Sequence, residues 1–256
     1  MRILIAESKT MGGCCDTVSP DYISRHRPRL DSLATTLMGQ WSEAGADKVV
    51  SALKVSPKLA AEFMKMAYEF PNKTTGGMAL PAYTGVVFKA LDYGSMSQEE
   101  QSRALETIDI ISSLYGWLRG GDLVKPYRLD FSPRMAPGGI AMSAYLKPLV
   151  TPLLMESLEE EGENEVLDLL PSDAAKCVDL ALLKSRGVRV AKAEFVMVGD
   201  AGRLKTPHST LLKTLRGKLL REIVCRQIGS IDELASALEE GLSASFAERG
   251  VVCTLS

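Results

Sequence analysis

The chain has 256 residues, of which 46% are hydrophobic and 24% charged, and its formal net charge is −2, a composition typical of a globular protein with a sizeable core. It contains no run of 18 or more apolar residues, so we expect neither a membrane span nor a membrane partner. Five cysteines without a disulfide-like framework favour a reducing compartment and a cytoplasmic protein, and only two histidines argue against a zinc site.

The first predicted element is a short buried strand at residues 2–6, followed by the polar segment Glu7-Ser8-Lys9-Thr10. The carboxyl ends of strands are the usual place for ligand-binding groups in open sheets. Lys9 and Thr10 could therefore hold an anion there. A solvated turn is the alternative, and these residues alone favour it.

Helical spacing of apolar residues predicts helices at 30–44, at 47–54 and from Pro57 to about residue 70. The turn Val55-Ser56-Pro57-Lys58 resembles a helix-hairpin-helix element, which offers backbone N–H groups to a nucleic-acid phosphate. Ser56 stands where that pattern prefers glycine, so the match is partial. A plain helical hairpin in the core fits about equally well.

The centre of the chain combines an apolar run with a polar, glycine-rich stretch. Residues 108–111 read as a buried strand, after which residues 113–131 read as a loop with glycines at 116, 120 and 121. This loop carries Ser113, Tyr115, Arg119, Tyr127 and Arg128. It is either a site held by a rigid scaffold or a strand end with a solvated turn.

The flanking segments continue the alternation of helices and strands. A helix opened by a capping box is predicted at 97–107, another at 143–160 that is interrupted or kinked at two prolines, and strands at 166–170 and 188–198. The chain then continues with a predicted hairpin at 199–202 and a return strand at 203–206. After them we expect one helix that follows His208-Ser209 and runs to about residue 228, a second helix at 231–240 and an edge strand at 245–254. No linker or repeat is apparent, so we expect one α/β domain, of the mixed α+β type, over residues 1–256.

Residues 203–226 hold seven Lys or Arg residues against one acid. On a helix, Lys213, Arg216 and Arg221 would lie on roughly one face. Gly217 in the middle of a helix costs about 1 kcal/mol relative to alanine. Close approach of another backbone or of a ligand would explain it, and a solvated basic face with a tolerated glycine is the alternative.

Many polar residues at the ends of apolar runs share one chemistry, which suits a phosphate or another polyanion. The cations are Lys9, Arg119, Arg128, Lys176, Lys205, Lys213 and Arg216, and the hydroxyls are those of Ser8, Thr10, Tyr83, Ser113, Tyr115, Tyr127, Ser172 and Ser209. We expect no metal and no cofactor, because no residue set has ligand spacing and neither a P-loop nor G-x-G-x-x-G occurs. A serine hydrolase is disfavoured by the absence of G-x-S-x-G.

Four segments occur in the order seen in one known family. They are Leu-Ile-Ala-Glu-Ser-Lys-Thr at 4–10, Tyr-Thr-Gly-Val-Val-Phe at 83–88, Leu-Tyr-Gly-Trp-Leu-Arg at 114–119 with the segment 122–129, and Lys-Thr-Leu-Arg-Gly at 213–217. In these segments, and over nearly the whole chain, the sequence resembles the YaaA family of bacterial peroxide stress response proteins. The resemblance implies a single α/β domain of unusual topology, with a central mixed sheet flanked by helices, a positively charged cleft and a helix-hairpin-helix-like element. It further implies binding to double-stranded DNA and a link to limiting unincorporated iron.

Three functions remain open at this point. The first is DNA binding in the basic cleft, the second is an enzyme acting on a nucleotide or nucleoside in the same cleft, and the third is a protein-interaction domain using the helix at 57–70. The first two require the distant cations Lys9, Arg119, Arg128, Lys213 and Arg216 to converge in space. A closed pocket would favour the enzyme, and an open groove would favour DNA.

Overall fold

The computed structural model describes residues 1–12, 20–73, 76–131, 136, 139–198, 204–242 and 251–256. Seven strands of these residues form one mixed sheet in the order β4-β3-β1-β6-β7-β8, with β9 also pairing with β7. Their bounds are β1 Arg2–Ala6, β3 Ile108–Ser112, β4 Gly116–Arg119, β6 Glu165–Asp168, β7 Arg189–Val198, β8 Leu204–Lys205 and β9 Val251–Leu255. A separate antiparallel pair joins β2 Gly77–Met78 to β5 Leu123–Val124. The predicted α/β class with a mixed sheet flanked by helices is confirmed.

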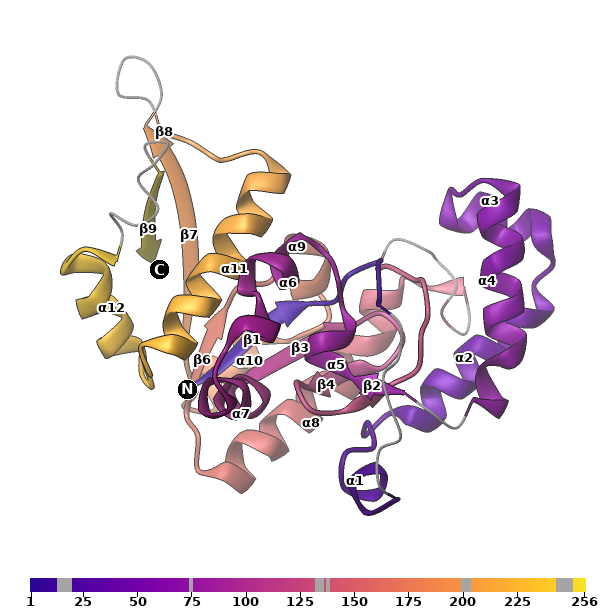
Figure 1. Ribbon diagram of the computed structural model, residues 1–256, viewed down its shortest axis with the longest axis horizontal. Coiled ribbons are helices and arrows are strands. Elements are labelled where there is room, and N and C mark those ends of the chain that lie inside the picture. The colour runs from indigo at the N-terminus through magenta and orange to yellow at the C-terminus, as the bar shows by residue number, and fades with distance from the viewer. Residues whose placement is uncertain (13–19, 74–75, 132–135, 137–138, 199–203, 243–250) are drawn as a thin grey trace.

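The helices surround this sheet (Figure 1). They are α1 Pro20–Arg25, α2 Asp31–Glu43, α3 Ala46–Leu53, α4 Pro57–Glu69, α5 Ala79–Ala82, α6 Val86–Leu91, α7 Gln98–Thr107, α8 Met142–Glu161, α9 Ser172–Ala175, α10 Leu180–Ser185, α11 Ser209–Cys225 and α12 Ile231–Glu239. Figure 1 shows α2, α3 and α4 gathered beyond one side of the sheet, and α12 beside β7 and β9 at the other. None of the helices in the described part of the chain has the length and hydropathy needed to cross a membrane.

The middle of the sheet is parallel and buried. β1 pairs in parallel with β3 on one side and with β6 on the other, and β6 pairs in parallel with β7. Every residue of β3 and the first four of β1 are buried, which explains why both segments read as continuous apolar runs rather than as alternating strands. Because these strands run in one direction, the segments that follow β1, β3 and β6 emerge at the same edge of the sheet.

The expected loop after β3 is in fact a strand reversal. Tyr115 and Gly116 turn the chain, with Gly116 at a φ of 69°, and β4 returns antiparallel to β3. A Cβ atom on Gly116 would lie 2.8 Å from a methyl group of Leu30 and 3.0 Å from one of Val150. The turn therefore needs glycine both for its backbone angle and for the packing of α8 against it.

The other differences from the sequence expectations are local. Pro148 and Pro152 lie inside α8 without interrupting it, so that expectation of a break is wrong. The capping box is confirmed, because Ser97 and Glu100 each accept a hydrogen bond from the other's backbone N–H. The predicted hairpin at 199–202 lies outside the described residues, whereas the strands expected on either side of it are present as β7 and β8. Residues 245–250 of the predicted edge strand also lie outside them, and its remainder is present as β9.

Candidate anion-binding cavity

A cavity of about 430 Å³ opens at the edge of the sheet where β1 and β6 end. Its walls come from segments that are distant in sequence. They include Glu7 to Thr10 after β1, Gly85 to Phe88 at the start of α6, residues 129–131, Leu169, Pro171 and Asp173 after β6, and Lys213 and Arg216 on α11. This is the position at which open parallel sheets place ligands.

The segment after β1 is held by backbone hydrogen bonds on two sides. The N–H of Glu7 donates to the carbonyl of Ile111 at 2.9 Å, and the N–H of Thr84 donates to the carbonyl of Thr10 at 3.0 Å. Gly85 lets this segment approach α6, because a Cβ atom there would lie 2.3 Å from Oγ of Ser8. The cavity wall that carries Lys9 and Thr10 is thus held by main-chain contacts, while both residues are exposed, as the solvated-turn alternative expects.

Three of the predicted cations stand around this cavity. Lys213 and Arg216 project from neighbouring turns of α11, and Lys9 lines the opposite wall, where it forms an ion pair with Asp130. Among the described residues, neither Lys213 nor Arg216 has an ion-pair partner. Nη2 of Arg216 donates to the carbonyl of Leu170 at 3.5 Å, whereas its Nε is buried without a hydrogen-bond acceptor in the described structure. Burial lowers the pKa of Arg216, and the nearby Asp168 opposes that shift. A guanidinium that is partly desolvated and incompletely paired is suited to binding an anion.

Gly217 is explained by the helix that it packs on. A Cβ atom at this position would lie 2.2 Å from the carbonyl oxygen of Val87 and 2.7 Å from Cβ of Ala90, both in α6. The close approach that the sequence suggested is therefore to another backbone. This contact sets the distance between α11 and α6. It thereby places Arg216 in the same cavity wall as the first residues of α6.

Glu7, next to these cations in the cavity wall, belongs to a buried hydrogen-bond cluster. The hydroxyl of Tyr127 donates to Oε2 of Glu7, and the same hydroxyl lies 2.6 Å from that of Tyr83 and 2.7 Å from Oγ of Ser112. Burial raises the pKa of Glu7 to about 7, although the hydroxyls of Ser113 and Tyr127 oppose this shift. Burial also raises the pKa values of Tyr83 and Tyr127 well above 10. Sequence reasoning named both tyrosines but missed Glu7, whose only signal was its place directly after a buried strand.

The predicted hydroxyl residues divide into buried and exposed groups. Tyr83, Ser113, Tyr115 and Tyr127 are each at most 3% exposed and do not line the cavity, so they present no surface to a macromolecule. Ser172 and Lys176 are exposed on α9, Ser209 is exposed at the start of α11, and Lys205 is exposed on β8. None of these four lines the cavity, although α9 contributes Asp173 to its wall, and Lys176 pairs with Asp173 at 3.7 Å.

The structure does not bring all five expected cations together. Arg128 is half-buried in the segment that leads to the cavity wall without lining the cavity itself. Arg119 lies at the other end of the sheet, because β4 runs antiparallel to β3 and pairs Arg119 with Asp109 across the ladder. There Arg119 forms an ion pair with Glu161 and donates to Oγ of Ser157 at 3.0 Å.

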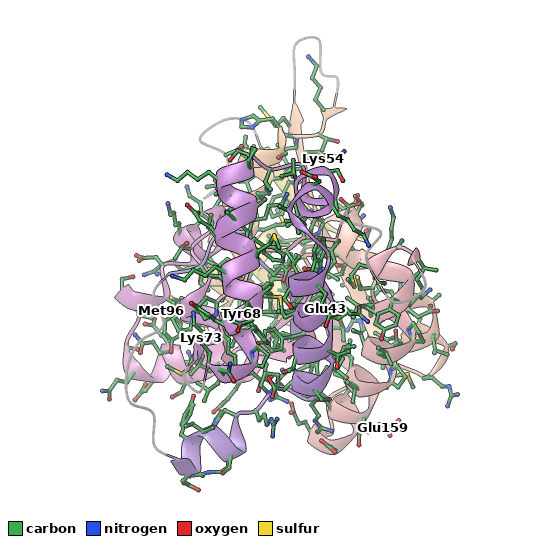
Figure 2. All side chains as sticks on the ribbon, turned by 90° about the vertical axis from the view of Figure 1, so that its right-hand side faces the viewer. Glu43, Lys54, Tyr68, Lys73, Met96 and Glu159 are labelled. Carbon is green, nitrogen blue, oxygen red and sulfur yellow. The ribbon has the colours of Figure 1, made fainter. Side chains whose placement is uncertain are left out.

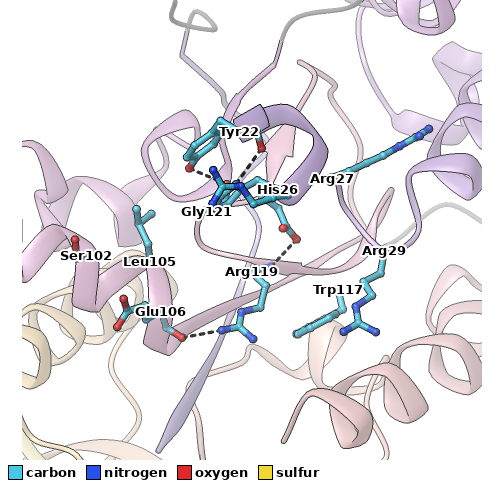
Figure 3. A pocket seen from close by; sticks show the side chains of 12 residues that line it. Tyr22, His26, Arg27, Arg29, Ser102, Leu105, Glu106, Trp117, Arg119 and Gly121 are labelled. Atoms are coloured by element: carbon cyan, nitrogen blue, oxygen red, sulfur yellow. Dashed lines mark hydrogen bonds between the residues drawn. The ribbon is translucent and has the colours of Figure 1, made fainter. Parts of the chain in front are cut away.

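Arg119 instead lines a second cavity of about 470 Å³ (Figure 3). Arg25, Arg27 and Arg29 also line it, and Tyr22 stacks on His26 with ring centroids 3.8 Å apart. Each of these arginines already has a carboxylate partner: Asp21 for Arg25, Asp31 for Arg27, and Glu156 and Glu160 for Arg29. Burial raises the pKa of Asp122 in its wall to about 7. Neither α1 nor this cavity beside it was predicted from the sequence.

The helical hairpin expected at residues 55–58 can be followed in Figure 2. α3 ends at Leu53, the following residue Lys54 adopts a left-handed conformation with a φ of 52°, and α4 begins at Pro57. Oγ of Ser56 caps α4 by accepting from the N–H of Leu59 at 3.3 Å. Lys58 is exposed, and Val55 packs partly against the core. A short turn between two helices thus leaves one lysine free to meet a ligand, and its role in DNA binding stays a prediction.

The described residues contain no group of three or more His, Cys, Asp or Glu side chains that could hold a metal ion. The cavity after β1 is instead lined by three cations, Lys9, Lys213 and Arg216, and by the carboxyl groups of Glu7, Asp130 and Asp173.

The fold and this cavity define a mixed α/β protein with a partly basic pocket at the carboxyl edge of a central parallel sheet. The family model described as "Peroxide stress protein YaaA" matches residues 1–247, and the chain therefore belongs to that family. It is 31% identical over 243 residues to a UPF0246 protein of Bacteroides fragilis, covering 94% of this chain and 92% of that protein. It is 32% identical to a UPF0246 protein of Bacteroides thetaiotaomicron over 94% of this chain and 92% of the relative, and 27% identical to one of Shewanella woodyi over 91% and 90%.

Proposed function

We propose that this peroxide stress protein binds double-stranded DNA through phosphate contacts made by the cations at the mouth of the cavity. The observation that carries the proposal is that Lys213 and Arg216 line the cavity from one helix while neither has an ion-pair partner among the described residues. Phosphate contacts of this kind supply affinity without reading sequence. A weak sequence preference is therefore part of the proposal.

The hairpin between α3 and α4 supports a second contact with the same ligand. Lys58 is exposed in the first turn of α4, where the positive end of the helix dipole also favours a phosphate. Cytoplasmic location belongs to the same proposal. It is supported by Cys177, which is a buried free thiol. The family's link to limiting unincorporated iron is also carried over as a proposal, supported by membership of the family alone.

A salt titration of duplex DNA binding tests the main proposal. For wild type, log K should fall by about 0.9 for each phosphate neutralised as log salt rises. Arg216→Ala should lower the affinity and reduce the slope by roughly one unit. Lys218→Ala is the matched control, because Lys218 is exposed on the same helix but does not line the cavity. A slope near zero, or equal effects of the two variants, would reject the DNA proposal at this site.

An enzyme or binding protein for a nucleotide or nucleoside is the second candidate, and the cavity itself favours it. Its volume of about 430 Å³ is in the range of small-molecule sites, and its wall combines apolar residues with a few polar groups. A site that only positions phosphates does not require a largely buried carboxyl group such as that of Glu7 in its wall. Tight binding of a mononucleotide, with DNA affinity indifferent to Arg216, would favour this candidate over the first.

A further inference from the structure

One arrangement of hydrogen bonds satisfies the hydroxyl groups of Tyr83, Ser112 and Tyr127 around Glu7, whereas Oγ of Ser113 has no hydrogen-bond partner in the described structure. Oγ of Ser112 accepts from the N–H groups of Leu114 at 3.1 Å and Tyr115 at 3.0 Å, so its own proton is available to Tyr127. Tyr127 has one proton and donates it to Glu7. It can then accept from both Ser112 and Tyr83, whose hydroxyls lie 2.7 and 2.6 Å away. All donors therefore point, directly or through Tyr127, toward Oε2 of Glu7.

The second oxygen of Glu7 is different. Oε1 is buried and has no hydrogen-bond partner in the described structure, although the Ser113 hydroxyl lies close enough to lower the pKa of Glu7, and Glu7 lines the cavity. A neutral carboxylic acid carries one proton, and Oε2 is already occupied as an acceptor. In the neutral form the proton thus belongs on Oε1, where the carboxyl group can act as a hydrogen-bond donor.

We propose that the cavity is a proton-gated binding site for a phosphate monoester of nucleoside size, in which neutral Glu7 donates a hydrogen bond from Oε1 to the ligand while Lys213 and Arg216 hold its phosphate. The inference rests on the nucleotide alternative given above and does not require DNA binding. When Glu7 loses its proton, the donor is lost and a negative charge faces the anion, so the ligand dissociates. A protonated carboxyl group beside a bound phosphate ester is also what a general acid would need.

Two carboxyl groups with raised pKa values lie at this site, Glu7 in the cavity wall and Asp168 beside Arg216, and only Glu7 lines the cavity. Burial raises the pKa of Glu7 to about 7. From the neighbouring elements, Tyr83 and Tyr127 have pKa values well above 10, and burial raises the pKa of the Cys177 thiol to about 12, with a further contribution from Glu7. The remaining charged groups in the cavity wall are Lys9, paired with Asp130, then Asp173 near Lys176, and the two cations of α11.

The test is the affinity for nucleoside monophosphates between pH 5.5 and 8.5, measured by titration calorimetry on the full chain. The probes are AMP, GMP, CMP and UMP, with inorganic phosphate for comparison. Glu7→Gln keeps the size of the side chain and replaces the acid by an amide donor that does not titrate. Because the phosphate itself titrates near pH 6, the quantity compared is the ratio of the wild-type dissociation constant to that of Glu7→Gln at each pH.

We expect this ratio to be constant below pH 6 and to rise roughly tenfold by pH 8, as wild-type Glu7 becomes ionised while the amide does not. Tyr127→Phe removes the donor that stabilises the carboxylate, so it should move the wild-type pH midpoint upward by roughly one unit. Asp122→Asn is the matched control, because Asp122 is a buried carboxyl with a pKa of about 7 in the other cavity. It should leave the wild-type pH profile unchanged.

Two results would overturn the inference: one rejects only the role of Glu7, and the other also rejects the nucleotide site. If a monophosphate binds but the ratio is the same at every pH, or Asp122→Asn abolishes the pH dependence, Glu7 is not the gate although the nucleotide site stands. If none of the probes binds at any pH, the nucleotide alternative fails together with the inference. The DNA titration with Arg216→Ala decides the main proposal separately. Should Glu7→Gln fail to fold, an unchanged pH midpoint in Tyr127→Phe would reject the gate.

Discussion

Tyr127 donates its hydroxyl proton to the carboxyl group of Glu7, which ties the end of β1 to the segment that follows β5. The bond joins residues that are 120 positions apart in sequence, and it stands at the floor of the cavity. Its energetic importance follows from burial, because a carboxyl group without water depends on its protein partners in both protonation states.

The pH dependence of stability should follow from this buried carboxyl. The pKa of Glu7 is about 7 in the folded protein, against about 4.5 for an ordinary glutamate, so the folded state holds the proton more tightly. Between these values the unfolded state binds fewer protons, and the free energy of unfolding therefore falls as pH rises. The loss for this group is roughly 3 kcal/mol, complete above pH 7. Asp122, with its pKa also raised to about 7, should add to the loss in the same range.

Urea unfolding at pH 5, 6, 7 and 8 measures this effect. We expect wild-type stability to decline over the range and Glu7→Gln to remove part of the decline, leaving the part due to Asp122. A stability that rises steadily from pH 5 to pH 8 would contradict the assignment.

Gly217→Ala should destabilise the protein, because its Cβ would lie 2.2 Å from the carbonyl oxygen of Val87. We expect a loss of about 1–3 kcal/mol, typical of overpacking, in the free energy of unfolding. Gly39→Ala, also in a helix, is the control, since no atom lies within 4 Å of the added Cβ. That substitution should stabilise the protein by about 0.5–1 kcal/mol through helix propensity. Similar effects of the two substitutions would show that α11 and α6 can separate without cost.

Lys58→Glu should weaken duplex DNA binding about equally for all sequences, because an exposed lysine at a helix start contacts phosphate rather than bases. Lys65→Glu provides the comparison, since Lys65 is exposed on the same helix two turns further on. Filter binding at low salt with several unrelated duplexes measures the effect. Unchanged affinity in Lys58→Glu, or an equal loss in Lys65→Glu, would mean that the turn between α3 and α4 is not a DNA contact.

Tyr83→Phe should cost about 1 kcal/mol of stability, since it removes one of two donors to the Tyr127 hydroxyl and Ser112 can still supply the other. Ser112→Ala should cost more, because Oγ of Ser112 also accepts from the N–H groups of Leu114 and Tyr115. Chemical denaturation of the two variants gives the comparison. A larger loss of stability in Tyr83→Phe than in Ser112→Ala would mean that the hydrogen bonds of Ser112 do not stabilise the turn after β3.

Local sequence determined the elements of this protein. The strands β1, β3 and β6 are buried on both faces. Such strands appear in the sequence as short, continuous apolar runs without alternation, which can be recognised without a structure. The start of α4 at Pro57 and the capping box at Ser97 were equally readable, because both depend on residues three or four positions apart. The resemblance to the family rests on the same kind of contiguous segments.

Only the tertiary structure decided which polar residues meet. Lys9, Lys213 and Arg216 share a cavity because parallel strands release their following segments at one edge and Gly217 lets α11 approach α6. Arg119 was predicted beside them, but the turn at Gly116 reverses β4 and carries it to the opposite end of the sheet. The buried position and raised pKa of Glu7 were likewise not predictable from the sequence, because desolvation depends on neighbours from distant segments of the chain, among them Ser113 and Tyr127, and no local pattern encodes that enclosure.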